Sequence, residues 1–235
     1  MHGLALYPMA GTSFFIKISL SMLILALACL PSYVMAANVG PGPISPVVQS
    51  SGGTTTIVGN TSITSSSSAV SVTNGTVELG GPNIQIQTSG TAFGFNIDAS
   101  ANPSFLSSLA GSYINIITTG STYSYGLWAT NPNNRVTSTM IQLSNASIRT
   151  SGNGSGGVIL ANLATGILSN LQIETFGGVD PGNNGAGAYG INTQFGAKGS
   201  FDNVSIVTHG VGGTGILNSN ASSFTGNNIT MNVQA

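Results

Sequence analysis

Few residues of this chain could perform acid–base chemistry, and they are scattered. The carboxylates are Glu78, Asp98, Glu174, Asp180 and Asp202. Glycoside hydrolysis uses two carboxyl groups about 5–9.5 Å apart, and a calcium site uses several acidic oxygens around one ion. The spacing of these five residues does not force any two of them onto one face. The sequence therefore predicts neither a catalytic pair nor an enzyme, although a site formed by folding stays open.

Nucleophilic and metal chemistry have even fewer candidate residues. A serine hydrolase needs a histidine and an orienting acid, and the only histidines are His2 and His209. His209 lies between Thr208 and a turn glycine, where equivalent positions carry Ser, Thr or Phe, so we interpret it as a turn residue. The single cysteine, Cys29, lies in an N-terminal targeting segment. We expect no disulfide, no metal and no cofactor in the rest of the chain.

Two groups of residues could contact a ligand. Three aromatic residues lie close together after a predicted turn, where they form either a sugar-stacking platform or partly buried packing. A long turn from 176 to 188 is rich in Gly, Asn and Pro, and such turns can bind ligands or simply be flexible. The candidate ligand-contact residues are Tyr123, Tyr125, Trp128, Asp180, Asn183 and Asn184.

Asn-x-Ser/Thr triplets recur along the chain and would be glycosylation sites in a eukaryotic secretory pathway. A composition rich in Asn, Ser and Thr also produces such triplets by chance, and we favour that explanation. The triplets begin at Asn60, Asn74, Asn145, Asn153, Asn203, Asn220 and Asn228.

The positions of all these residues depend on a phrase that occurs five times, apolar-x-Ile-x-Thr-x-Gly. Its alternation predicts a half-buried strand that ends in a turn. The central isoleucines are 30, 32, 25 and 33 residues apart, and a repeat of this length indicates a solenoid or a propeller. The repeated residues are Ile86, Thr88, Gly90; Ile116, Thr118, Gly120; Ile148, Thr150, Gly152; Ile173, Thr175, Gly177; and Ile206, Thr208, Gly210.

A second predicted strand follows each phrase and begins with a glycine. In the last three copies, from Gly157, Gly190 and Gly215, the next phrase starts 14 residues later, which leaves room for a third short strand. The pattern predicts an all-β, right-handed parallel β-helix with about three strands per coil. We expect the isoleucines to stack in the core, the threonine hydroxyls to form a ladder, and glycine to make the corners.

Composition and the N-terminal segment give the expected domain organisation. Only 4% of residues are charged and the net charge is −1, so nothing favours a nucleic-acid partner. Lys17 precedes an apolar run over 18–30 that is short for a membrane span, and 1–36 is predicted to be a signal peptide with a helix, cleaved after Ala36. An uncleaved anchor is the alternative. We expect an extended Pro-rich leader over 37–49, irregular capping coils over 50–80, and regular repeats over 81–235 with an open end.

These features together resemble the passenger region of a bacterial autotransporter, in particular the pertactin-like and AIDA-like adhesins. The resemblance covers about 37–235 and rests on the signal peptide, the Cys-free Gly/Asn/Ser/Thr-rich region and the Ile-x-Thr-x-Gly rungs. It implies export, display at the cell surface as an adhesin or structural stalk, and a host-surface or glycan ligand.

The resemblance also implies a C-terminal outer-membrane β-barrel, in the same or an adjacent reading frame. The 235 residues contain no such barrel, so we expect a passenger fragment that would remain in the periplasm if it stood alone. No functional residue is carried over, because these passengers share a shape and not a motif. A secreted carbohydrate-active β-helix enzyme and a glycosylated wall protein are the competing hypotheses.

Overall fold

The computed structural model describes residues 37–99, 102–132, 138–179 and 187–234, and every regular element in them is a β-strand. The predicted signal helix and the cleavage site at Ala36 lie outside these residues. In the described part of the chain, no helix is long and apolar enough to cross a bilayer.

The strands, in chain order, have the following bounds. They are β1 Ala37–Val39, β2 Gly42–Ile44, β3 Val47–Gln49, β4 Thr54–Val58, β5 Thr61–Ser65, β6 Val70–Val72, β7 Gly75–Gly80, β8 Ile84–Ser89, β9 Phe93–Asp98, β10 Ser104–Ser108, β11 Ile114–Thr122, β12 Tyr125–Thr130, β13 Thr139–Asn153, β14 Gly156–Ala161, β15 Thr165–Thr175, β16 Tyr189–Gln194, β17 Lys198–His209, β18 Thr214–Asn218 and β19 Ser223–Gln234.

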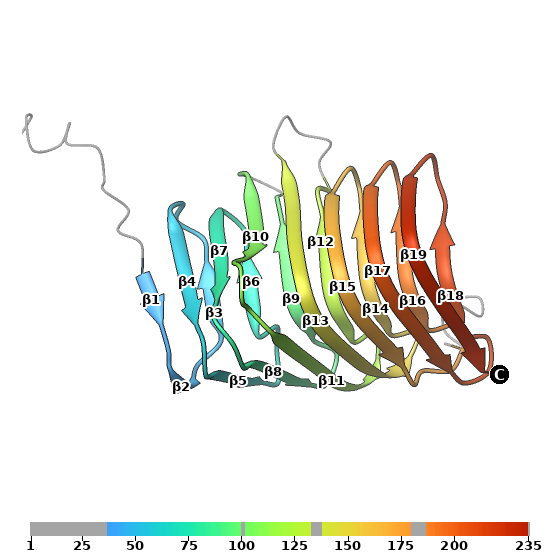
Figure 1. Ribbon diagram of the computed structural model, residues 1–235, viewed down its shortest axis with the longest axis horizontal. Helices are drawn as coiled ribbons and strands as arrows, with labels where there is room; N and C mark the ends of the chain where they lie inside the picture. Colours follow the sequence, from blue (N-terminus) through green and yellow to red (C-terminus); the bar gives the residue numbers. More distant parts are fainter. Residues whose placement is uncertain (1–36, 100–101, 133–137, 180–186, 235) are drawn as a thin grey trace, which may run out of the picture. The chain divides into compact units, whose positions relative to one another are not determined.

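The strands stack as a β-solenoid, which confirms the predicted parallel β-helix. A 12-stranded sheet contains two stacks that meet at β13, and a seven-stranded sheet of β3, β6, β9, β12, β14, β16 and β18 closes each coil. All described pairings are parallel, for example β11 with β8 and β13. Figure 1 shows the chain descending the 12-stranded sheet and returning along the seven-stranded sheet, with the right-handed sense usual for parallel crossovers.

The N-terminal part differs from the expected leader and irregular caps. Residues 37–49 form β1, β2 and β3, which pair with β4, β5 and β6. Residues 50–80 continue the same three stacks through β7. The repeat phrase is absent from these coils, but Ile57, Ile63 and Val70 point inward and are fully buried. Inward apolar residues and main-chain pairing are therefore sufficient to form a coil without the phrase.

The later coils have fewer breaks than expected, because the predicted third strand and the phrase strand merge. Each of β13, β15, β17 and β19 runs through both stacks and bends at an asparagine with positive φ: Asn145, Asn170, Asn203 and Asn228, with φ between 52° and 55°. Asparagine tolerates this left-handed conformation better than most residues. The amides also join along the stack, since Nδ2 of Asn170 donates to Oδ1 of Asn145 over 3.1 Å and Nδ2 of Asn203 donates to Oδ1 of Asn170 over 2.7 Å.

This corner explains much of the triplet pattern. After the corner asparagine comes an inward residue and then an outward Ser or Thr, as in Asn145-Ala146-Ser147 and Asn203-Val204-Ser205. Five triplet asparagines have positive φ: Asn60, Asn145, Asn203, Asn220 and Asn228. A left-handed turn thus accounts for the asparagine in five of the seven triplets. It does not account for the Ser or Thr, because the corners at Asn83 and Asn170 are followed by Gln85 and Gln172.

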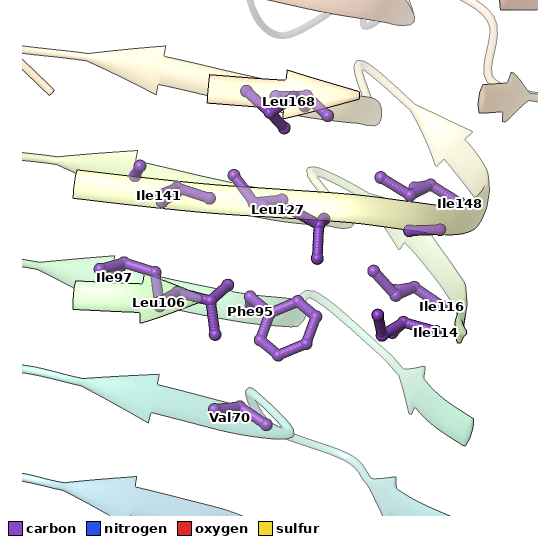
Figure 2. Packing of buried hydrophobic residues seen from close by; sticks show 14 of the residues in the cluster. Val70, Phe95, Ile97, Leu106, Ile114, Ile116, Leu127, Ile141, Ile148 and Leu168 are labelled. Carbon is purple, nitrogen blue, oxygen red and sulfur yellow. The ribbon is translucent and has the colours of Figure 1, made fainter. Parts of the chain in front are cut away.

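The five phrase isoleucines stack in one file inside the solenoid. The pairing register joins Ile86, Ile116, Ile148, Ile173 and Ile206 directly, and none is more than 2% exposed. Figure 2 shows Ile116 and Ile148 above one another, with Leu127, Phe95 and Leu106 filling the space between the sheets. The core is therefore a continuous column of aliphatic and aromatic side chains.

The glycine that begins the second predicted strand of a repeat, such as Gly157, lies where a single side chain fills the space between the two sheets. A Cβ on Gly157 would lie 2.3 Å from Cγ2 of Ile173 and 2.6 Å from the carbonyl oxygen of Gly190. Gly126 and Gly190 face Ile148 and Ile206 in the same way. Four of the five phrase isoleucines, from Ile116 to Ile206, therefore require a glycine on the opposite sheet, which accounts for the joint recurrence of the two residues.

The phrase threonines are buried but do not form the expected hydroxyl ladder. Thr88, Thr118, Thr150, Thr175 and Thr208 are at most 1% exposed, and none of their hydroxyls has a hydrogen-bond partner. Equivalent atoms on neighbouring strands are about 4.8 Å apart, whereas an O–H···O bond needs about 2.5–3.0 Å. The stacking that aligns the side chains thus keeps their hydroxyls apart.

Candidate functional site

An aromatic platform, which we define as Phe93, Tyr125 and Trp128, lies on the outer face of the seven-stranded sheet. The ring centroids are 5.5 Å apart for Phe93 and Tyr125, 5.8 Å for Phe93 and Trp128, and 5.2 Å for Tyr125 and Trp128, with interplanar angles of 11°, 16° and 26°. All three side chains are half-buried. The platform combines the two predicted residues of β12 with Phe93, which pairs with Tyr125 from β9.

Local backbone geometry places Tyr125 and Trp128 on the same face. Residues three apart on a regular strand point to opposite faces, but the pairing register passes over Gly126 and its neighbour Gly157. Gly126 and Leu127 are both buried, so the alternation shifts by one residue. The third predicted aromatic residue, Tyr123, lies at the preceding turn with a φ of 49° and lines the same hollow as Tyr125 and Trp128.

The hollow beside the platform, which we call the Gly156 notch, is lined by Tyr125, Trp128, Ile159, Tyr189 and Asn192. Gly156 pairs with Tyr125 on one side and Tyr189 on the other. Its lining carries no charged side chain. Aromatic surfaces beside a side-chain amide can stack a ligand ring and hydrogen-bond its polar groups.

A second group, the charged cluster, consists of Arg149, Glu174, Phe176 and His209 on the outer face of the 12-stranded sheet. Arg149 Nε lies 3.4 Å from Glu174 Oε2, and His209 Nε2 lies 3.1 Å from Glu174 Oε1. The Phe176 ring stacks on His209 at 4.5 Å, and the Arg149 guanidinium lies 4.5 Å from the centre of the same ring. The Arg149 and Glu174 side chains are 58% and 42% exposed, so their ion pair contributes about 0–1 kcal/mol.

The sequence interpretation missed this cluster, although the repeat alignment contained the signal. Arg149 and Glu174 both follow a central isoleucine, and the register pairs them directly. Phe176 and His209 both precede a turn glycine. Residues 25 to 60 positions apart in the chain are thus brought onto neighbouring rungs, and His209 is a member of a cluster instead of an ordinary turn residue.

The other described carboxylates lie elsewhere. Glu78 accepts a hydrogen bond from Thr56 Oγ1 over 3.4 Å, and Asp202 accepts one from Asn227 Nδ2 over 2.7 Å. The registers place Glu78, Asp98, Glu174 and Asp202 in four different outward columns. Within the described ranges, no group of three or more His, Cys, Asp or Glu side chains could hold a metal ion. Asp180, Asn183 and Asn184 lie outside the described residues.

Comparisons with known proteins do not assign a family. No family model matches the chain, and neither the curated proteins nor the solved structures searched give a match. The fold defines a class, the parallel β-solenoids, and any narrower assignment depends on the site and on the resemblance noted in the sequence.

Proposed function

We propose that this chain is the passenger-type portion of an exported bacterial surface protein, and that it acts as a non-catalytic adhesin or structural stalk. The observation that carries the proposal is the continuous parallel solenoid with polar, almost uncharged outward columns. One such column reads Ser62, Gln85, Asn115, Ser147, Gln172, Ser205 and Thr230. Stacked rungs of this kind make an extended scaffold that presents residues along its length.

The proposed partner in the same pathway is an outer-membrane β-barrel, encoded in the same or an adjacent reading frame. The absence of cysteine after Cys29 suits this route, because no disulfide would form in an oxidising periplasm before the chain crosses a second membrane. The proposed location is the cell surface when a barrel is attached and the periplasm otherwise. A glycan or another host-surface molecule is the proposed ligand class.

The test combines genetics with display. We expect the adjacent DNA to encode segments of about ten residues with alternating hydrophobicity and aromatic girdles, which mark a barrel. We also expect residues 37–235, fused to a bacterial outer-membrane barrel, to become accessible to external protease and to increase adherence of the displaying cells. Adherence equal to that of cells displaying the barrel alone, or adjacent DNA without barrel segments, would count against the proposal.

A carbohydrate-active enzyme is the second candidate, and the charged cluster is the observation that favours it. Glu174 contacts both Arg149 and His209, an arrangement that could move a proton. The test is turnover of a panel of polysaccharides by the purified protein and by Glu174→Gln and Asp180→Asn variants. Turnover that disappears in either variant would favour the enzyme, and no turnover by the unaltered protein would eliminate it.

A further inference from the structure

The outward column of the seven-stranded sheet has a gap in its aromatic residues. Neighbouring rungs carry Phe93, Tyr125, Gly156 and Tyr189 in direct register. Gly156 has no side chain, and the strands that carry Tyr125 and Tyr189 are two strand spacings apart, about 9.6 Å. A ring in van der Waals contact at about 3.5–4.0 Å on each side needs about 7–8 Å. Cδ1 of Ile159 and Cδ1 of Tyr125 lie over Gly156 itself, so a ligand ring would lie further out, in the hollow that Tyr125 and Tyr189 line.

The floor and one wall of the notch are apolar. A Cβ on Gly156 would lie 3.1 Å from Cδ1 of Ile159 and 3.3 Å from Cδ1 of Tyr125, so these side chains lean over the glycine. Phe93 and Tyr125 come from adjacent strands and stack with an angle of 11°, so their rings pile up along the solenoid. Trp128 stacks on both rings. Of these three residues, Tyr125 and Trp128 line the notch. The C–H face of a sugar ring fits such a surface.

The notch also contains a polar group without a partner. Asn192 lines the notch, the residue is only 5% exposed, and its Oδ1 makes no hydrogen bond. A buried acceptor without a partner is unfavourable, and a small rotation of the amide would let it accept a hydrogen bond from a ligand hydroxyl. Gln194, two residues further along β16, supplies a second amide at the edge.

We propose that the Gly156 notch binds one hexose unit of a neutral oligosaccharide, stacked on Tyr125 and Trp128 and held by the amide of Asn192. The neutral class follows from the uncharged lining of the notch, because an acidic sugar calls for a nearby cation to compensate its charge. The biological role of this sugar binding rests on the proposed adhesive function. The location of the site does not, because it is argued from the residues that line the notch.

The experiment uses Trp128, the only tryptophan of the chain, as a built-in reporter. Purified protein is titrated with maltohexaose, cellohexaose and a β-1,3-glucan hexamer, with hexagalacturonate as the acidic comparison, and tryptophan emission is followed with calorimetry in parallel. We expect a saturable change with at least one neutral hexamer and at least tenfold weaker binding of hexagalacturonate. No saturable change with any neutral hexamer would overturn the proposal.

Variants place the binding at the notch. We expect Tyr189→Ala and Asn192→Ala to weaken binding at least tenfold while the circular dichroism spectrum and melting temperature are retained. Because Asn192 Oδ1 has no hydrogen-bond partner, we expect Asn192→Ala to lose sugar binding without losing folding stability. Tyr113→Ala is the matched control, because Tyr113 is 48% exposed in the connection before β11 of the other sheet, and this variant should bind like the unaltered protein. Binding retained in both notch variants, or lost instead in Arg149→Ala, would assign the sugar to another surface.

The two proposals fail separately. If the purified protein binds no neutral hexamer but displaying cells still adhere, the notch assignment is wrong and the adhesive function stands. If the protein binds the sugar through Asn192 but is not displayed through a barrel, the notch assignment stands and the passenger proposal is wrong.

Discussion

Ile173 shows how strictly an inward position is determined. It is 2% exposed, and its Cγ2 occupies space that leaves no room for a Cβ on Gly157. Ile173→Asp would lose about 1.5–3 kcal/mol of apolar burial. It would also bury an acid without a partner, at a cost above the roughly 2–7 kcal/mol of an unpaired amide or hydroxyl. We expect loss of the cooperative melting transition, measured by circular dichroism.

The matched control is the preceding residue on the same strand. Gln172 points outward and is exposed, so Gln172→Asp should change the melting temperature by only a few degrees. If Ile173→Asp melted like Gln172→Asp, Ile173 would not face the interior and the stacking of the five isoleucines would be refuted.

The buried threonines give a prediction of opposite sign. Because the Thr150 hydroxyl is buried without a partner, Thr150→Val removes a desolvation cost of about 1–3 kcal/mol and keeps the branched shape. We expect the urea midpoint to rise with an unchanged m-value, corresponding to a gain of about 1 kcal/mol. Valine already occupies this column at Val233, which pairs with Thr208.

Thr119 supplies the contrast for Thr150. It is exposed, and its Oγ1 donates to the carbonyl oxygen of Thr88 over 3.1 Å, so Thr119→Val should lose up to about 1 kcal/mol. A clear loss in Thr150→Val as well would mean that the buried hydroxyl is hydrogen-bonded in solution.

The bent strands depend on their corner asparagines for both backbone conformation and side-chain bonding. Asn170 has a φ of 52° and bonds to Asn145 and Asn203. Asn170→Ala loses both bonds and must hold alanine in a left-handed conformation, which costs about 1–2 kcal/mol. Asn170→Gly loses the bonds alone. We expect the alanine variant to be less stable than the glycine variant by about 1 kcal/mol in urea unfolding.

Asn115 tests this separation because it has the side-chain bond without the corner. Its Nδ2 donates to Gln85 Oε1 over 2.9 Å from within β11. In a regular strand glycine is worse than alanine, so the order of the two variants should reverse at Asn115. The same order at both sites would show that the corner conformation contributes nothing.

The predictable elements are those in which one physical constraint recurs. The strands β8, β11 and the second halves of β13, β15 and β17 could be located from sequence, because each carries the repeated phrase. From β11 to β17, a thin core also pairs the phrase isoleucine with a glycine on the opposite sheet. The strands β1, β2, β3 and β5 could not, because valine, threonine and proline satisfy main-chain pairing there without repeating the phrase.

The candidate sites were predictable only in part, because the pairing register of the strands decides which distant residues become neighbours. Tyr125 and Trp128 are neighbours in the chain, so their grouping was visible, whereas Phe93 joins them only through the pairing of β9 with β12. The charged cluster depends wholly on such pairing, since Arg149, Glu174 and His209 come from three strands. Coil lengths vary from one repeat to the next, so a fixed spacing does not identify neighbouring residues. The residues that lie side by side on two rungs can be found only after the repeats are aligned position by position.

For the solenoid as a whole, each rung contacts only the rungs on either side, and stability should therefore be local. Strand β15 pairs with β13 and β17 and with no strand of the first coils. Ile173→Ala, a core truncation that costs about 2–5 kcal/mol, should raise amide exchange more than about tenfold in β13, β15 and β17, since about 1.4 kcal/mol corresponds to a factor of ten. Exchange in β4, β5 and β6 should change by less than about twofold, as measured by hydrogen-exchange mass spectrometry with Gln172→Ala as the control. A uniform increase from β1 to β19 would instead show that the solenoid opens as one unit, so that distant rungs are coupled and the nearest-neighbour description does not hold.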